Sequence, residues 1–170
     1  MIDNAKTKKA SRLQKCNPCD AEAAFTKLVQ LCCVRERSAY ELRKRLLNCG
    51  FDAQACDNAI NRAIACEIVN DMRFADAWIR GKLNLGWGIR RIEREIKHYG
   101  ICANAFTNWP DCYSDGANER KRALAELERH RPRAKNVRAA RFRHLLNKGY
   151  AADVAHQALL VFESEAFALG

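Results

Sequence analysis

The sequence predicts an all-α protein built from three tandem three-helix repeats. Three segments share one pattern of apolar and basic residues, and they read SAYELRKRLLNCGF, GIRRIEREIKHYGI and VRAARFRHLLNKGY. They end at Gly50, Gly100 and Gly149, so the glycines are 50 and 49 residues apart. A large apolar residue follows each glycine, as expected where a helix stops at a left-handed glycine and the next residue folds back onto its last turn. No segment has the alternation of a strand, so the repeat sets the fold class.

Apolar residues recur at helical spacing inside each segment, which predicts one buried stripe per helix. The stripe consists of Ala39, Leu42, Leu46 and Cys49 in the first segment, of Ile89, Ile92, Ile96 and Tyr99 in the second, and of Ala139, Phe142 and Leu146 in the third. The third stripe is displaced by one residue, as is the expected N-cap, Asn136. Ser38 and Glu41 form a capping box at the first start, whereas Gly88 gives the second a weaker start.

Further helices flank each segment, so each repeat is expected to hold three helices and the chain about nine. The upstream helices carry Ala24, Leu28 and Leu31, then Phe74, Ala77, Trp78 and Leu85, then Ala123, Leu124 and Leu127. The downstream helices are expected over residues 53–66, 103–109 and 151–162. A unit of this size buries little apolar surface alone, so neighbouring repeats should stack. The predicted domains are a flexible basic arm at 1–20 and repeats at 21–69, 70–115 and 116–170.

The charge is strongly basic and unevenly distributed. The 170-residue chain has a net charge of +10 at pH 7, which favours an acidic protein surface or nucleic acid as a partner. Residues 129–152 contain no acid but eight basic residues, which are Arg129, Arg131, Arg133, Lys135, Arg138, Arg141, Arg143 and Lys148. No apolar run approaches the roughly 20 residues of a membrane span. The N-terminus has no secretory pattern, so we expect a cytoplasmic protein without membrane contact.

Nine cysteines raise the hypothesis of a thiol redox or metal protein. Cys49, Cys56 and Cys66 fit small apolar positions of helices and are expected to be buried thiols. Cys16 and Cys19 form a C-x-x-C motif, but the next pair is adjacent rather than spaced, which disfavours zinc. A thioredoxin-like role is disfavoured because no β-α-β pattern surrounds the motif.

No pattern of catalytic residues is evident. The four histidines, His98, His130, His144 and His156, are scattered, and none stands at a catalytic spacing from a nucleophile or carboxylate. The sequence contains no phosphate-binding glycine loop, and Gly86-x-Gly88 is expected to allow close helix packing or a tight turn. We therefore predict a protein without catalytic residues, cofactor or metal.

Three longer stretches resemble the RecX regulatory family: RERSAYELRKRLLNCGF, IVNDMRFADAWIRGKLNLGWGIRRIEREIKHYGI and FRHLLNKGYAADVAHQAL. The resemblance runs from about residue 21 to residue 162. It implies an elongated, curved monomer in which the repeats form a right-handed-type helical array. It also implies a partner, the RecA recombinase filament on DNA, with weaker phosphate contacts to single- and double-stranded DNA. The implied activity is to restrain filament growth, which lowers the ATPase, strand-exchange and coprotease activities of RecA in recombination, DNA repair and the SOS response.

Basic side chains are the predicted contact residues for the partner. The second segment places four of them opposite its isoleucine stripe, and a loop before the third segment is expected to carry three more. Arginine suits this role because its planar fork can bind a carboxylate or phosphate with two hydrogen bonds. The predicted set is Arg43, Arg45, Arg73, Arg80, Arg90, Arg91, Arg94, Lys97, Arg131, Arg133, Lys135, Arg138 and Arg141.

Alternatives to a contact role stay open at this point. The basic face of the second segment could simply be solvated, with Glu93 paired to Lys97 at helical spacing. The chain could also bind nucleic acid generally, through salt-dependent phosphate contacts, and affect RecA only indirectly. Phe74 and Trp78 are expected in the core rather than stacked on bases, and Asp71 is expected to cap the helix that follows it.

Overall fold

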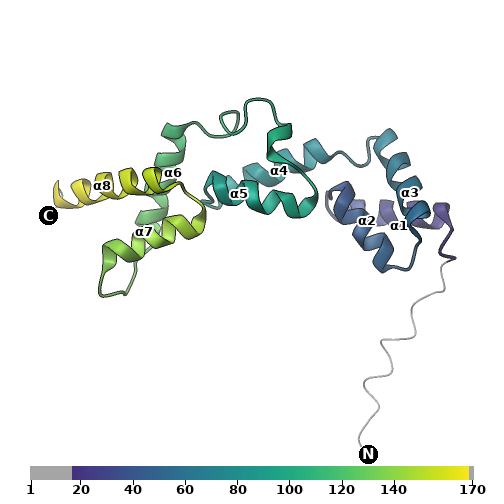
Figure 1. Cartoon of the computed structure of the whole chain (residues 1–170), viewed down its shortest axis with the longest axis horizontal. Coiled ribbons are helices and arrows are strands. Elements are labelled where there is room, and N and C mark those ends of the chain that lie inside the picture. Colours follow the sequence, from purple (N-terminus) through teal and green to yellow (C-terminus); the bar gives the residue numbers. More distant parts are fainter. Residues whose placement is uncertain (1–16, 169–170) are drawn as a thin grey trace, which may run out of the picture. The chain divides into compact units, whose positions relative to one another are not determined.

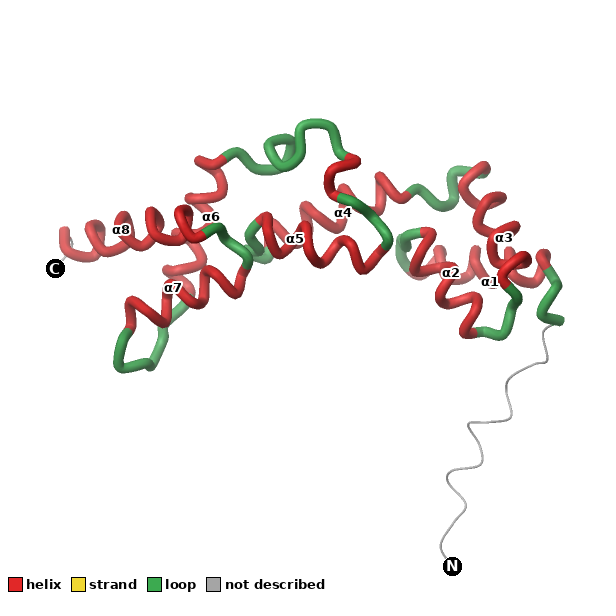
Figure 2. The backbone as a smooth tube through the Cα atoms, viewed as in Figure 1, coloured by secondary structure: helices red, strands yellow, loops and turns green. Residues whose placement is uncertain are grey.

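The computed structural model describes residues 17–168, so residues 1–16 of the arm predicted at 1–20 lie outside the described part. Eight α-helices and two short 3-10 helices make up the described residues, and no strand occurs among them (Figures 1 and 2). The prediction of an all-α fold is therefore confirmed. The chain divides into two compact units, Met1–Asp71 and Met72–Gly170.

The first unit is one three-helix domain. It consists of α1 (Ala21–Val34), α2 (Ala39–Asn48) and α3 (Ala53–Ala65). The helices start at Asp20, Ser38 and Asp52, and each of these side chains accepts a hydrogen bond from a first-turn N–H, as good N-caps do. The core of this domain comprises Ala24, Leu28, Leu42, Leu46, Phe51, Ala55, Cys56, Ala59, Ile60, Ala63 and Val69.

The second unit contains two hydrophobic cores. The first core lies between α4 (Asp71–Asn84), α5 (Ile89–Ile96) and the 3-10 helices Lys97–Tyr99 and Ala103–Ala105. The second core lies between α6 (Gly116–Arg129), α7 (Val137–Lys148) and α8 (Ala152–Ala168). Most basic side chains of the unit are exposed.

The three repeat glycines end their helices as predicted. Gly50, Gly100 and Gly149 have φ values of +96°, +76° and +93°, which place them in the left-handed region. The next residue folds back into the core in each repeat. Phe51, Ile101 and Tyr150 are buried, with exposed fractions of 4%, 6% and 1%.

The predicted ninth helix, over residues 103–109, is absent from the described structure. A 3-10 turn at Ala103–Ala105 is followed only by further turns. Two physical causes act together. Pro110 cannot continue a helix, and Phe106 packs edge-to-face on Tyr113 with ring centroids 5.6 Å apart, so aromatic contacts rather than helical ones order this segment.

The predicted stripe of the third segment is wrong at its last position, whereas Phe142 packs against the core as predicted. Leu145 is fully buried, whereas Leu146 is 38% exposed. Leu145 stands four residues before its glycine, as Leu46 and Ile96 do, so α7 keeps the register of the other repeats at this position. The N-cap is displaced by one residue, because the Asn136 side chain accepts the hydrogen bond of Ala139 N–H at 2.9 Å.

The buried face of α4 also differs from the prediction. Phe74 is buried as predicted, and three further residues, Ala75, Ile79 and Leu83, form the buried stripe. Ala77 is exposed, and Leu85 lies beyond the end of the helix with 60% of its surface exposed. The three buried residues are four apart and lie on one face, which Ala77 cannot share.

Ser38 caps α2 as predicted, but Glu41 and Asp71 have other roles than expected. Ser38 accepts the hydrogen bond of Glu41 N–H, but the Glu41 carboxylate binds nearby arginines instead of reaching back. Asp71 is the first residue of α4 rather than its cap, and it accepts a hydrogen bond of 2.8 Å from Ala39 N–H at the start of α2. A carboxylate at a helix N-terminus stabilises the unpaired N–H groups there.

The cysteine predictions hold only in part. Cys56 is fully buried and Cys49 is half-buried, but Cys66 is exposed at the C-cap of α3. Cys66 follows the last helical residue, so the helical spacing that predicted its burial no longer applies. Cys19 is exposed, and its partner in the C-x-x-C motif, Cys16, lies outside the described residues.

Candidate partner-contact surface

The polar face of α5 and its C-cap residue carry three exposed basic residues, Arg90, Arg94 and Lys97. Their spacing of four and three places them in one row along the helix. Arg94 approaches Glu95 at 3.4 Å, a contact between side chains adjacent in sequence. Within residues 17–168, no ion pair includes Arg90 or Lys97, so the predicted pairing of Glu93 with Lys97 does not form. This row is an excess of positive charge open to a partner.

Arg91, the fourth predicted residue of this face, belongs to the packing of the protein. Its guanidinium lies 3.7 Å from the ring centroid of Trp87, and Lys82 lies 4.7 Å from the same ring. These cation–π contacts occupy Trp87, which also meets Trp78 edge-on at 6.1 Å. Trp78 and Trp87 therefore act in packing, as expected for Trp78.

A repeat junction, made of Gly86, Gly88, Gly149, Tyr150 and Arg91, fixes the start of α5. Gly88 N–H donates to the Lys148 carbonyl at 2.9 Å, and Arg90 N–H donates to the Gly149 carbonyl at 3.2 Å. These carbonyls satisfy N–H groups that the Gly88 cap leaves without a side-chain partner. The predicted weak start of α5 is thus completed by the third repeat, which orients the basic row.

The close approach at this junction requires glycine on both sides. A Cβ on Gly88 would meet backbone atoms of Gly149 and Tyr150 well inside van der Waals contact, and one on Gly149 would meet the backbone of Arg91. Tyr150 completes the contact because its hydroxyl donates to the Gly86 carbonyl at 3.1 Å. Burial raises the pKa of Tyr150 to about 12, so it remains a neutral donor. The expectation that Gly86 and Gly88 permit close packing is confirmed.

Glu126 is a buried acid that sequence reasoning missed. Its carboxylate accepts from Lys148 Nζ at 2.8 Å and contacts His144 Nε2 at 3.0 Å. Burial raises the pKa of Glu126, but the hydrogen bonds from Lys148 and His144 outweigh burial and hold that pKa below its ordinary value. Its position offered a signal, since Glu126 falls three residues after Ala123, inside the apolar stripe of α6.

The basic residues around α7 fall into two groups. Arg131, Arg133 and Lys135 are exposed on the loop before α7, as predicted, and no ion pair found in the described part of the chain includes them. Arg138 is 3.3 Å from Glu163, and Arg141 lies 4.4 Å from the ring centroid of Phe162. Among the predicted contact residues of this region, the loop group is therefore the one without a partner in the described part of the chain.

The remaining predicted contact residues are partly neutralised by local acids. Arg43 binds Asp57 through two nitrogens, at 2.7 and 3.2 Å. The other pairs are Arg45 with Glu41 at 2.9 Å and Arg80 with Asp76 at 2.9 Å. Arg73 is exposed on the first turn of α4. Their role toward a partner stays a prediction.

The histidines are less scattered than their sequence positions suggested. The rings of His130 and His144 stack with centroids 3.8 Å apart and planes 3° apart. His144 also contacts Glu126, so three residues from α6, its C-cap and α7 form one polar cluster. A spacing of 14 residues across a loop gave no signal for this pairing.

The described residues form neither a metal-binding group nor a membrane-spanning helix. In residues 17–168, no group of three or more His, Cys, Asp or Glu side chains is placed to hold a metal ion. In the same part of the chain, no helix has the length and apolar character needed to cross a membrane.

Two family profiles match the chain. The profile described as "RecX, first three-helix domain" matches residues 24–62, and "RecX, second three-helix domain" matches residues 70–105. The fold and these profiles define a helical protein of tandem three-helix domains. Both profiles describe the RecX family, to which the chain is similar over these two domains.

Individual relatives are similar over different lengths. Regulatory protein RecX of Haemophilus influenzae is 31% identical over 74 residues, which cover 44% of this chain and 49% of that protein. The chain thus spans about half the length of this relative. Regulatory protein RecX of Haemophilus ducreyi is 29% identical over 136 residues, which cover 75% of this chain and 84% of that protein.

Solved structures share the fold. The crystal structure of RecX from Lactobacillus salivarius matches with a TM-score of 0.71 and 17% identity, over 85% of this chain and 97% of that chain. A second crystal structure of regulatory protein RecX matches with a TM-score of 0.68 and 13% identity, over 81% of this chain and 70% of that chain.

Proposed function

We propose that this chain binds the RecA filament on DNA and restrains its growth, which lowers RecA ATPase, strand-exchange and coprotease activity. The observation that carries the proposal is the exposed basic row of α5, together with the similarity to the RecX family. Arg90 and Lys97 have no acidic partner among the described residues, and the repeat junction holds their helix in place. Binding alone accounts for the effect, so the chain acts as a monomer without catalysis.

RecA-catalysed, DNA-dependent ATP hydrolysis tests the proposal. The chain is titrated at fixed salt and fixed single-stranded DNA. We expect hydrolysis to fall when the chain is present at less than one molecule per RecA. Simple competition for DNA would need protein in proportion to DNA sites, so a fall only at saturation of the DNA would contradict filament modulation.

A pair of charge reversals tests the basic row itself. Arg90→Glu with Arg94→Glu should weaken inhibition at least tenfold, because it replaces attraction by repulsion at an exposed face. Arg120→Glu with Lys121→Glu is the matched control, since it changes the net charge equally on exposed positions of α6. Equal losses for both pairs would show that net charge rather than this row matters. Circular dichroism of both pairs checks that helix content is unchanged.

A second candidate function is general nucleic-acid binding with an indirect effect on RecA. The unpaired loop residues Arg131, Arg133 and Lys135 favour it, because clustered basic residues bind phosphates without base specificity. Fluorescence anisotropy with a labelled single-stranded oligonucleotide distinguishes the two. Tight binding without RecA at physiological salt would support this candidate, and weak binding would contradict it.

A further inference from the structure

The N-terminal half of α7 packs loosely on its neighbours. The position occupied by Leu42 in α2 and Ile92 in α5, eight residues before the repeat glycine, is occupied by Arg141 in α7. Leu42 and Ile92 are fully buried, whereas Arg141 is half-buried and folds over Phe162. Leu145 is the single buried residue of α7. The helix is therefore anchored near its C-terminus. Figure 1 shows that α7 and α8 are close at the turn that connects them and diverge with distance from it.

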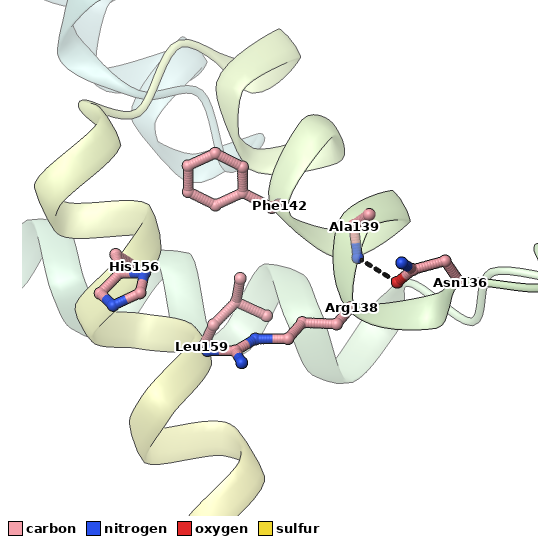
Figure 3. A pocket seen from close by; sticks show the side chains of 6 residues that line it. All are labelled: Asn136, Arg138, Ala139, Phe142, His156 and Leu159. Carbon is pink, nitrogen blue, oxygen red and sulfur yellow. Dashed lines mark hydrogen bonds between the residues drawn. The ribbon is translucent and has the colours of Figure 1, made fainter.

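A cavity of about 320 Å³ opens where the two helices diverge. We name it the α7–α8 groove, and its lining residues are Asn136, Arg138, Ala139, Phe142, His156 and Leu159 (Figure 3). Its volume is at the lower end of the range for small-ligand pockets, about 300 to 1,000 Å³. The volume has room for an apolar side chain of a partner.

The walls of the groove are mainly apolar, and two of its three polar lining residues, Asn136 and Arg138, already have partners within the chain. Leu159 is 1% exposed and Phe142 packs on the same core. Asn136 Oδ1 already accepts from Ala139 N–H, as Figure 3 shows, and Arg138 is paired with Glu163. A nucleobase is recognised through hydrogen bonds along its edges, and these engaged groups do not supply them.

The surroundings select an acidic partner. The adjacent loop carries Arg131, Arg133 and Lys135, all exposed and without an ion pair among the described residues. Leu160 follows His156 by one helical turn, is 49% exposed, and extends the apolar surface beside the groove. An apolar centre with a basic rim is the arrangement that complements an acidic segment with one apolar anchor.

We infer that the α7–α8 groove binds an acidic segment of a partner protein by taking up one apolar side chain of that segment. The groove supplies the anchor site, and the loop residues attract the flanking carboxylates. This contact goes beyond the proposed function, because it involves neither DNA nor the basic row of α5 and does not depend on the partner being RecA.

Two labelled peptides of about ten residues test the inference by fluorescence anisotropy with the full chain. Both are rich in Asp and Glu, and one has Leu at its centre where the other has Ser. We expect the Leu peptide to bind at least tenfold more tightly. Equal affinities, or no binding of the Leu peptide at about millimolar protein, would overturn the inference, because charge alone would then account for any attraction.

A matched pair of variants locates the site. Ala139→Glu places a carboxylate in the groove and should abolish the preference for the Leu peptide. Ala140→Glu adds the same charge on the next residue of α7, which faces the separate cavity lined by His130, Arg143 and His144, and should retain the preference. Loss of the preference in both variants, with unchanged helix content, would overturn the assignment to this groove.

A labelled oligo-dT provides the last comparison. If Ala139→Glu weakens oligo-dT binding tenfold more than Ala140→Glu does, the groove takes a base and the inference is wrong. We expect similar, small effects of both variants on oligo-dT. RecA ATPase measured with Ala139→Glu separates the two proposals. If this variant loses peptide binding and still inhibits RecA, the groove is not required for RecA inhibition, and the two proposals stand or fail independently.

Discussion

At the residue scale, Gly88 is where the second and third repeats come closest. Its φ of −79° is open to any residue, so only the nearby backbone of Gly149 and Tyr150 excludes a side chain. We expect Gly88→Ala to destabilise the protein by about 2 kcal/mol, because overpacking against backbone is not easily relieved. Gly81→Ala, in α4 with nothing within 4 Å of the added carbon, should instead stabilise by about 1 kcal/mol. Urea unfolding measures the change in free energy of unfolding for both variants. Changes of the same sign would contradict the close contact at Gly88.

The core residue Ile92 supplies a second prediction at this scale. Ile92 is fully buried among the side chains of α4 and α5. Ile92→Asp should unfold the core of α4 and α5, because a buried carboxylate has no partner there. Ile92→Val should cost only about 1 kcal/mol. If Ile92→Asp melted at the same temperature as the unsubstituted chain, the residue would not be in the core.

At the element scale, the contact between α6 and α7 depends on pH. Burial first, and then the neighbouring His144, lower the pKa of His130 below its ordinary value of 6.5. The unfolded chain therefore takes up a proton at a higher pH than the folded chain does. Stability contributed by neutral His130 is complete above pH 6.5 and is lost as the pH falls through that value toward the lower folded pKa. Glu126 responds at lower pH, below its ordinary value of 4.5, because its folded pKa is also lowered.

Thermal melting between about pH 7.5 and pH 5.5 tests this dependence. The native chain should lose stability over this range, and His130→Gln should lose less, because glutamine does not titrate. His98→Gln is the matched control, since His98 is exposed and its change should leave the profile as in the native chain. Identical profiles for all three proteins would remove His130 as the cause.

At the scale of the whole molecule, a net charge of +10 makes binding to polyanions dependent on salt. Replacing Arg131, Arg133 and Lys135 together by Ala should lower the slope of log affinity against log salt for single-stranded DNA by about 2, since each lost phosphate contact lowers it by about 0.7. Replacing Arg43, Arg45 and Arg80 together should change it less, because acids already neutralise these residues. Anisotropy titrations at several salt concentrations measure the slope for both triple variants. Equal slopes would contradict the difference between unpaired and acid-paired residues.

Sequence patterns predicted local features well and contacts between repeats poorly. The ends of α2 and α7 follow from Gly50 and Gly149, because a left-handed stop depends only on adjacent residues. The basic row of α5 also follows from helical spacing. The separation of Arg91 from that row could not be predicted, because it depends on Trp87 and on the close approach of Gly149, which lies 58 residues away in the sequence.

The sequence by itself determined the all-α class, the repeat, the capped helix starts and the excess of basic residues. Each of these depends on neighbours within one or two helical turns. Tertiary structure alone decided which cations remain free, how the Gly88 start of α5 is completed, and where Glu126, His130 and His144 meet. These outcomes depend on which distant groups share space, since a charge or an N–H group is satisfied by its nearest partner in three dimensions and not by its nearest partner along the chain.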